Sequence, residues 1–281
     1  MSNKLKGFLY ILVGIIVFAL TIIFNNIDNK IAAELYDNYV ELSSPLKNDE
    51  FNGKLISTTG ELTYKYEDVV DDDFSIKVPS AVLIRNVEMF VWTEEETTEE
   101  GQTSYTYRKK WSSELIDSNK FRFQERYINP KKMPYESKTI YNYQVKLGDF
   151  SLGENELKQL NAKTKFIPNI KNVKLPKGYS ISGEYITNSK NIDSPSVGDV
   201  RISYTYNTDT NVSVLAKQKD NSFESYKTKD GHNVDIVLSG TYSGNEMIKH
   251  FEKDNYVRNN IFVILSLIIV TFGILKTMKK E

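Results

Sequence analysis

The sequence predicts an α+β membrane protein: an antiparallel-sheet-rich extracytoplasmic domain flanked by an N-terminal and a C-terminal transmembrane helix. Three observations support this prediction. Apolar residues gather in two runs near the ends of the 281-residue chain, although its mean hydropathy is -0.42. Beside each run the apolar residues recur with the period of a helix. Between these segments the period falls to two, as in strands that place alternate side chains on opposite faces.

The first apolar run, residues 7–24, predicts a transmembrane helix. It contains 18 residues without a charge, of which 13 are Leu, Ile, Val or Phe. At about 1.5 Å per residue it spans roughly 27 Å, close to the hydrocarbon thickness of a bilayer. A cleaved signal peptide is the alternative, but the run is long for one and Asn25-Asn26-Ile27-Asp28 offers no cleavage pattern of small residues. We therefore expect an uncleaved anchor.

The second apolar run predicts a transmembrane helix over residues 261–278. Ser266, Thr271 and Gly273 interrupt the core of this run, residues 261–275, and Lys276 can extend toward the interface. Lysines precede the first run and follow the second, so residues 1–6 and 279–281 are expected in the cytoplasm. The prediction is a cell-membrane protein with two spans, both termini cytoplasmic and residues 25–260 outside. Removing Lys4, Lys6 and the net +2 of residues 276–281 from the chain's -1 leaves -5 outside, which argues against binding to an anionic lipid surface.

Helical necks are expected to join the spans to the outer domain. Ile27, Ile31 and Leu35 begin an apolar stripe in residues 27–42, which should end before Pro45. Residues 243–256 carry a second stripe, and Ser243 followed by Glu246 has the spacing of a capping box. We expect each stripe to pack on the opposite neck or on the underside of the sheet.

Strands dominate the prediction between the necks, and no linker divides this region. Residues 81–92 and 105–111 predict a long hairpin with an exposed, charged tip at 93–104, in which Trp92 is buried and Trp111 lies on the neighbouring strand. Further strands are predicted at residues 138–147, 199–206, 211–218, 222–227 and 234–240, the last four forming an antiparallel meander, and a short helix is predicted at 154–160. The 18 Tyr and 14 Phe are interpreted mainly as packing residues, with a carbohydrate or peptide platform as the alternative.

The residue content restricts the chemistry. With no cysteine and only His232 and His250, disulfides, thiolate metal sites and three-histidine zinc sites are excluded. The balance of 36 basic and 37 acidic residues disfavours nucleic-acid binding. The acidic segments 71–73 and 94–100 are expected to be an exposed turn and a solvated hairpin tip, with cation binding as the less favoured alternative. We therefore predict no catalytic residue, no metal site and no cofactor.

Several motifs in one order resemble the transmembrane protein 43 family, also called LUMA. They are Arg85-Asn-Val-Glu-Met-Phe-Val-Trp-Thr-Glu94, Tyr105-Thr-Tyr107 before Trp111, Asn129-Pro130 before Met133-Pro134, Leu147-Gly-Asp-Phe-Ser-Leu152, Val197-Gly-Asp-Val-Arg201, and Leu238-Ser-Gly240 with Glu246-Met247. The resemblance implies a structural or organising membrane protein with a large extracytoplasmic domain and no established catalytic residues. Eukaryotic members carry several spans after this domain, whereas this sequence shows one, and its richness in Lys, Asn and Ile suggests a bacterial-type member.

These observations favour a non-enzymatic membrane protein that acts as a scaffold or membrane organiser. Its expected partners are the lipid bilayer and other membrane proteins, self-association included, and not nucleic acid. The first alternative is a membrane-anchored module that binds or senses an envelope ligand. A hydrolase of envelope polymers is a more remote alternative, because neither histidine lies in a recognisable catalytic motif.

Overall fold

The computed structural model describes residues 2–64, 68–99 and 101–278. Its contacts divide the chain into two compact units, unit 1 (residues 1–62, 147–159 and 210–281) and unit 2 (residues 63–146 and 160–209). The chain passes from one unit to the other four times. Each unit is therefore discontinuous in sequence, which explains why no single linker-like segment marks the division.

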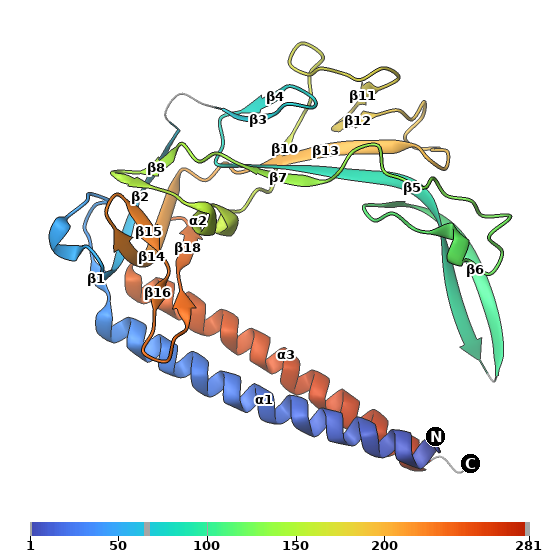
Figure 1. Ribbon diagram of the computed structural model, residues 1–281, viewed down its shortest axis with the longest axis horizontal. Helices are drawn as coiled ribbons and strands as arrows, with labels where there is room; N and C mark the ends of the chain where they lie inside the picture. Colours follow the sequence, from blue (N-terminus) through green and yellow to red (C-terminus); the bar gives the residue numbers. More distant parts are fainter. Residues whose placement is uncertain (1, 65–67, 100, 279–281) are drawn as a thin grey trace. The chain divides into compact units, whose positions relative to one another are not determined.

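Unit 1 contains two long helices, α1 (Asn3–Asn38) and α3 (Gly244–Met278), which lie side by side (Figure 1). Each runs without a break from an apolar span into its neck, as expected for α1. Helix α1 ends at Asn38, four residues before the predicted end of its neck, because the chain then pairs in parallel with the sheet through β1 (Val40–Glu41). Helix α3 begins with the predicted capping box: the Ser243 N–H donates to Glu246 Oε2 at 2.8 Å, and Ser243 Oγ accepts from the Glu246 N–H at 3.4 Å.

A seven-stranded sheet accompanies these helices. Its order is β1, β2 (Leu55–Tyr64), β8 (Val145–Leu147), β9 (Phe150–Ser151), β15 (Ser222–Glu224), β14 (Asn211–Lys219) and β18 (Ile236–Ser239), and β14 also pairs with β2. The smaller elements are η1 (Asp49–Phe51), α2 (Glu154–Gln159) and the hairpin of β16 (Tyr226–Lys227) and β17 (Asn233–Val234). The short helix predicted at residues 154–160 is thus confirmed.

Unit 2 is built around the long strand β5 (Val82–Glu99). The sheet order is β11 (Ser180–Ser182), β12 (Tyr185–Thr187), β13 (Val200–Tyr206), β5 and β6 (Gln102–Ser112), with β10 (Thr164–Phe166) on β13 and β7 (Lys138–Tyr141) on β5. A hairpin of β3 (Val69–Asp71) and β4 (Ile76–Val78) and the turn η2 (Ser118–Lys120) complete the unit. Pairing in this sheet is antiparallel throughout, in agreement with the predicted fold class.

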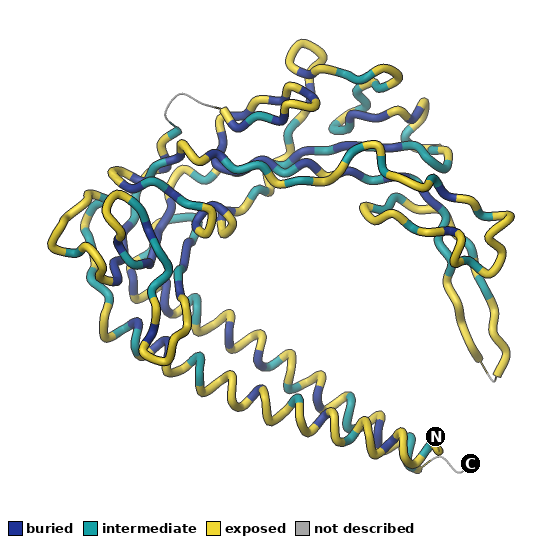
Figure 2. Tube along the Cα trace, in the orientation of Figure 1, coloured by how far each residue is buried: buried dark blue, intermediate teal, exposed yellow. Residues whose placement is uncertain are grey.

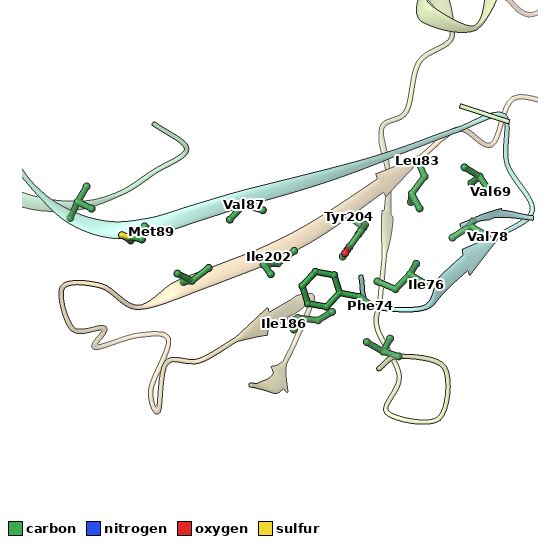
Figure 3. Packing of buried hydrophobic residues seen from close by; sticks show 13 residues of the cluster. Val69, Phe74, Ile76, Val78, Leu83, Val87, Met89, Ile186, Ile202 and Tyr204 are labelled. Carbon is green, nitrogen blue, oxygen red and sulfur yellow. The ribbon is translucent and has the colours of Figure 1, made fainter. Parts of the chain in front are cut away.

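The core of unit 2 follows from the alternation along β5. Leu83, Val87, Met89 and Val91 point inward and are buried against Ile186, Ile202 and Tyr204 of the neighbouring strands and against Phe74, Ile76 and Val78 of the β3–β4 hairpin (Figure 3). Along β5, buried residues alternate mainly with intermediate ones before the exposed end of the strand, as the dark blue, teal and yellow colours of Figure 2 indicate. The inward row also contains one charged side chain, Arg85, which is 3% exposed.

Three predictions about the extent or the pairing of strands are wrong. Residues 138–147 form two strands, β7 and β8, which belong to different sheets. The predicted meander does not exist as one unit, because β13 pairs with β5 whereas β14 pairs with β2, β15 and β18. Residues 93–104 are not a loop at the hairpin tip: β5 and β6 stay paired from Met89↔Ser112 to Glu99↔Gln102. The side chains beyond Glu94 on β5 are nevertheless exposed, as predicted.

Candidate functional site

Glycines bring the two long helices into close contact within the apolar segments. Gly7, Gly14, Ser266 and Gly273 are buried there, while the large apolar side chains around them are exposed. A Cβ on Gly14 would lie 2.5 Å from Cγ2 of Val270 and 2.9 Å from the Ser266 carbonyl oxygen. A Cβ on Gly273 would lie 2.8 Å from the Gly7 carbonyl oxygen. Small residues permit such backbone approach, the main source of helix association in lipid, where apolar burial gives no driving force.

The exposed surface of the helix pair fits a bilayer. In the most apolar 18-residue window of α1, 17% of the residues are buried inside the protein, and in that of α3 the share is 11%. A core helix of a soluble protein buries most of its apolar surface, whereas both of these helices are exposed along most of their length (Figure 2). Leu12, Ile15, Ile264 and Ile268 are among the exposed residues. Both helices are long and apolar enough to cross a membrane.

A polar junction lies just beyond the apolar segments. Arg258 Nη2 of α3 donates to Asp28 Oδ2 of α1 at 2.6 Å, and Asn259 Nδ2 donates to the same oxygen at 3.0 Å. Asn259 Nδ2 also lies 3.4 Å from Asn25 Oδ1. These bonds lie one turn outside the segment predicted to span the membrane, where hydration of the charges remains possible. They fix the register of the two helices against each other.

The two necks then pack on each other and on the sheet of unit 1. Ile31, Ala32 and Leu35 of α1 and Met247 and Ile248 of α3 are buried in one cluster with Leu55, Leu215, Val234 and Ile236. Polar contacts flank this cluster: Tyr36 Oη donates to Glu252 Oε2 at 3.0 Å, and the Gly244 N–H donates to Glu41 Oε2 at 2.8 Å. Burial and the Glu252 carboxylate raise the pKa of Tyr36 to about 12, so the phenol remains a donor. Both partners predicted for the apolar stripes, the opposite neck and the sheet, are therefore confirmed together.

Helix α1 is also tied to the β16–β17 hairpin. Glu34 accepts a hydrogen bond of 3.1 Å from Tyr226 Oη and one of 3.0 Å from the Lys229 N–H. His232 lies in this hairpin and is exposed, and its backbone N–H donates to Thr228 Oγ1 at 3.0 Å. His250, on α3, packs its ring against Tyr242 with ring centroids 5.1 Å apart.

Unit 2 contains a charge cluster centred on two buried side chains, Arg85 and Asp71, which the sequence did not predict. Arg85 Nη1 donates to Asp71 Oδ2 at 2.9 Å and to Asp73 Oδ2 at 2.6 Å, and its Nε donates to the Glu136 carbonyl at 2.9 Å. Tyr204 Oη donates to Asp71 at 2.8 Å, and Lys138 Nζ lies 3.1 Å from Asp71 Oδ1. The prediction of an exposed turn at residues 71–73 is wrong for Asp71, whose side chain is 0% exposed.

The electrostatics of this cluster favour a structural role. Two acidic and two basic side chains meet here, and both oxygens of Asp71 have partners. The Arg85 guanidinium holds the pKa of Asp73 below its usual range, and burial raises the pKa of Tyr204, which keeps the phenol protonated as a donor to Asp71. A sequence signal existed: Arg85 interrupts an alternating apolar row, so the pattern itself predicts a buried charge that needs an acidic partner.

A second missed residue is Asn129, which completes the free edge of β5. Its side-chain Oδ1 accepts from the Trp92 N–H at 2.8 Å, and its Nδ2 donates to the Trp92 carbonyl at 2.9 Å. The amide thus makes the two bonds that a neighbouring strand would make. Trp92 lies on the strand next to that of Trp111, as predicted, but it is only half-buried, between the Tyr127 ring at 4.8 Å and Lys109 Nζ at 4.7 Å.

The described residues offer little for catalysis or metal binding. Among them there is no group of three His, Asp or Glu side chains that could hold a metal ion. Of the acidic segment 94–100, Glu94 is engaged: its Oε2 accepts from Tyr107 Oη and, at 2.6 Å, from the Arg122 N–H. Residues 95–99 are exposed strand residues, and Glu100 lies outside the described residues.

The fold and the helix pair together define an integral membrane protein with two membrane-spanning helices and an α+β part rich in antiparallel sheet. Sequence comparison agrees with this class. The family described as Transmembrane protein 43 matches residues 89–279, about two-thirds of the chain, and the chain belongs to this family. This confirms the resemblance found in the motifs.

Curated relatives from animals share this family. The chain is 29% identical to "Transmembrane protein 43" of Mus musculus over 234 residues, 28% identical to that of Homo sapiens over 234 residues, and 24% identical to the "Transmembrane protein 43 homolog" of Drosophila melanogaster over 238 residues. These alignments cover 74%, 74% and 79% of this chain but 56%, 56% and 61% of the relatives, so the chain spans little more than half of their length. No solved structure matches the chain.

Proposed function

We propose that this protein is a non-enzymatic scaffold that organises other membrane proteins through its extracytoplasmic part. The observation that supports the proposal is the unbroken packing of α1 and α3, from the glycine contacts in the apolar segments to the shared core with the sheet of unit 1. A helix pair that is fixed to a sheet transmits position and force between bilayer and domain, which a flexible tether does not. The proposed location is the cell membrane, with both termini in the cytoplasm, and the partners include other copies of the chain.

Co-purification in mild detergent tests this function. A scaffold retains membrane-protein partners without added ligand, so cross-linked native membranes should yield a reproducible set with the unmodified chain. Phe251→Ser, which weakens the packing between neck and sheet, should reduce that set while the protein stays in the membrane. Tyr256→Ser is the matched control, because Tyr256 lies on the same helix and is 66% exposed. Equal recovery of partners with both variants would contradict a scaffold that depends on this junction.

The same experiment separates the scaffold from the alternative of a ligand-sensing module. Such a module would recover partners only after addition of an envelope extract, and would lose them when the extract is removed. The hydrolase alternative is tested by His232→Ala and His250→Ala. If the purified protein degrades an envelope polymer and either substitution abolishes that activity, the non-enzymatic assignment is wrong.

A further inference from the structure

The segment of unit 2 made of β10 and the loop after it carries positive charge without any acidic residue. Residues 163–177 contain five lysines and no Asp or Glu, and all five are exposed: Lys163, Lys165, Lys171, Lys174 and Lys177. Lys165 forms an ion pair of 2.8 Å with Glu184. The other four have no acidic partner within 4 Å among the described residues. The loop is therefore a local cationic surface on a protein whose total charge is -1.

The same loop exposes two isoleucines. Ile167 is 63% exposed and Ile170 is 73% exposed. The Asn172 N–H donates to the Asn169 carbonyl at 2.8 Å, and the Lys171 N–H donates to Asn169 Oδ1 at 3.0 Å, which forms a turn with Ile170 and Lys171 at its tip. Exposed apolar side chains beside unpaired lysines are the composition of surfaces that lie in a membrane interface.

The exposure of these isoleucines is built into the loop. Val173 is buried in the core of unit 2, and Phe166, Leu175 and Tyr179 pack against that core. The Lys174 N–H donates to the Phe74 carbonyl at 2.7 Å, which holds the backbone between them. Because the apolar residues on either side are packed inward, the loop has a fixed outer face, and Ile167 and Ile170 lie on it.

A polar hollow beside the turn adds to the cationic surface. It is lined by Lys77 of β4 together with Lys171 and Lys174, and by Ser75, Asn172 and Asp68. Three lysines and one carboxylate therefore line the hollow. The ammonium groups are strong donors for phosphate oxygens, so the hollow suits a phosphate-bearing headgroup next to the inserted isoleucines.

We propose that residues 163–177, with Lys77, dock on the surface of an anionic bilayer. The lysines bind lipid phosphates, and Ile167 and Ile170 enter the interface between headgroups and acyl chains. The net charge of -5 on residues 25–260 does not prevent this, because charges more than about 8 Å away are largely screened at physiological salt. A free anion would use the lysines but leave both isoleucines in water, whereas a bilayer offers the phosphates and the apolar interface together. The proposal does not depend on the scaffold function.

The absence of cysteine allows a direct test with the full-length protein. Ile170→Cys, labelled with a small fluorophore, is placed in nanodiscs of phosphatidylcholine alone or with about one-third phosphatidylglycerol, each with nitroxide-labelled lipid as quencher. Tyr143→Cys, at an exposed position of the same unit, is the matched control. A second arm adds anionic, nitroxide-labelled vesicles to protein held in phosphatidylcholine nanodiscs without nitroxide. We expect quenching at position 170 that requires anionic lipid and exceeds that at position 143, in one of the two arms.

Charge reversal completes the test. The double variant Lys171→Glu, Lys174→Glu should weaken the quenching that requires anionic lipid at least tenfold, because each lysine near such a surface raises the membrane affinity about fivefold. Lys131→Glu with Lys132→Glu makes the same charge change at exposed positions of unit 2 and should leave it unchanged. Equal quenching with and without anionic lipid, or an equal effect of both reversals, would overturn the proposal. So would inorganic phosphate or an acidic protein binding at this loop without any lipid response.

Discussion

The buried acidic side chains Asp71 and Glu156 differ in the number of polar groups that contact their carboxylates. Asp71 is surrounded by partners: Arg85, Lys138 and the Tyr204 hydroxyl all contact its carboxylate. Glu156, which is 1% exposed, accepts one hydrogen bond of 2.8 Å from the Gly153 N–H, and its Oε1 has no hydrogen-bond partner in the structure. The Asp71 carboxylate has three partners and the Glu156 carboxylate has an oxygen without one, so substitutions at the two sites should have different consequences.

Removing Arg85 should strongly destabilise unit 2. In Arg85→Met the carboxylate of Asp71 stays buried without its main partner, and the loss of unfolding free energy should be about 3 to 5 kcal/mol. The double variant Arg85→Met, Asp71→Asn should lose less unfolding free energy than the sum of the losses in the two single variants, because it leaves no unpaired buried charge. Denaturant unfolding of the detergent-solubilised protein measures both. Additive losses in the double variant would show that the two groups do not act as a pair.

The stability of Glu156→Gln relative to the unmodified protein should depend on pH. Burial raises the pKa of Glu156, so the folded state binds a proton more tightly than the unfolded state, whose carboxyl titrates near pH 4.3. The stabilising contribution is therefore fully present below about pH 4 and is lost as the pH rises through the raised pKa of the folded state. As the pH falls from 7 to 4, the unfolding free energy of the unmodified protein should rise relative to that of the variant by an amount on the order of 1 kcal/mol. Parallel stability curves over this range would contradict the assignment.

At the scale of elements, local signals were sufficient for the helices but not for the sheets. The apolar runs, the necks and the Ser243–Glu246 box depend on neighbours within four residues, and the structure has α1 and α3 where these signals lie. Strand positions were also largely predictable, since β5 and β13 follow the alternation, although β14 is buried without interruption from Val212 to Ala216. The sheet to which each strand belongs is set by contacts distant in sequence, such as Val200↔Met89, and a meander was therefore predicted where β13 and β14 separate. The role of Asn129 was not predicted for the same reason, because its hydrogen-bond partner Trp92 is 37 residues away in the sequence.

The glycine contacts predict that a larger residue at position 14 separates the two long helices. Gly14→Leu places atoms where Val270 and the Ser266 carbonyl already lie. Val13→Leu on the same helix is the control, since Val13 is 40% exposed. Cysteines replacing Tyr10 and Phe272, whose rings are 5.2 Å apart, report helix proximity through a short bifunctional reagent. Cross-linking should fall several-fold in Gly14→Leu and remain in Val13→Leu; unchanged yields in both would mean that close backbone contact does not hold the pair.

The necks should loosen when their apolar stripes are interrupted. Ile31 is 8% exposed, and Phe251 packs on the same cluster. Replacing both by Ser should cost several kcal/mol locally, by loss of apolar burial and by the cavities left behind. Hydrogen exchange should accelerate in residues 27–38 and 244–256, while the strands of unit 2 stay protected. Fast exchange at these necks in the unmodified protein would show that they are flexible tethers and would remove the mechanical basis of the scaffold proposal.

At the scale of the whole molecule, the helix pair constrains membrane topology. A Cβ on Gly7 would lie 2.4 Å from Cγ2 of Thr277, so the start of α1 and the end of α3 are adjacent, as Figure 1 also shows. Adjacent helix ends cannot lie on opposite sides of a bilayer. Whatever the orientation, both helix ends therefore share one side, and the proposal that this side is the cytoplasm rests on the flanking lysines Lys4, Lys6 and Lys276.

Protease protection tests this topology. It distinguishes whether the two helix ends share one side of the membrane from whether that side is the cytoplasm. In cells without an outer barrier, added protease should digest residues between 25 and 260 while tags at both termini survive. Permeabilising the membrane should then expose both tags together, which is the internal control. If both tags are cut in intact cells and the region between the spans survives, the helix pair stands but the orientation taken from the lysines is reversed. If one tag is cut and the other survives, the two ends lie on different sides, and the antiparallel pairing of α1 and α3 is itself wrong.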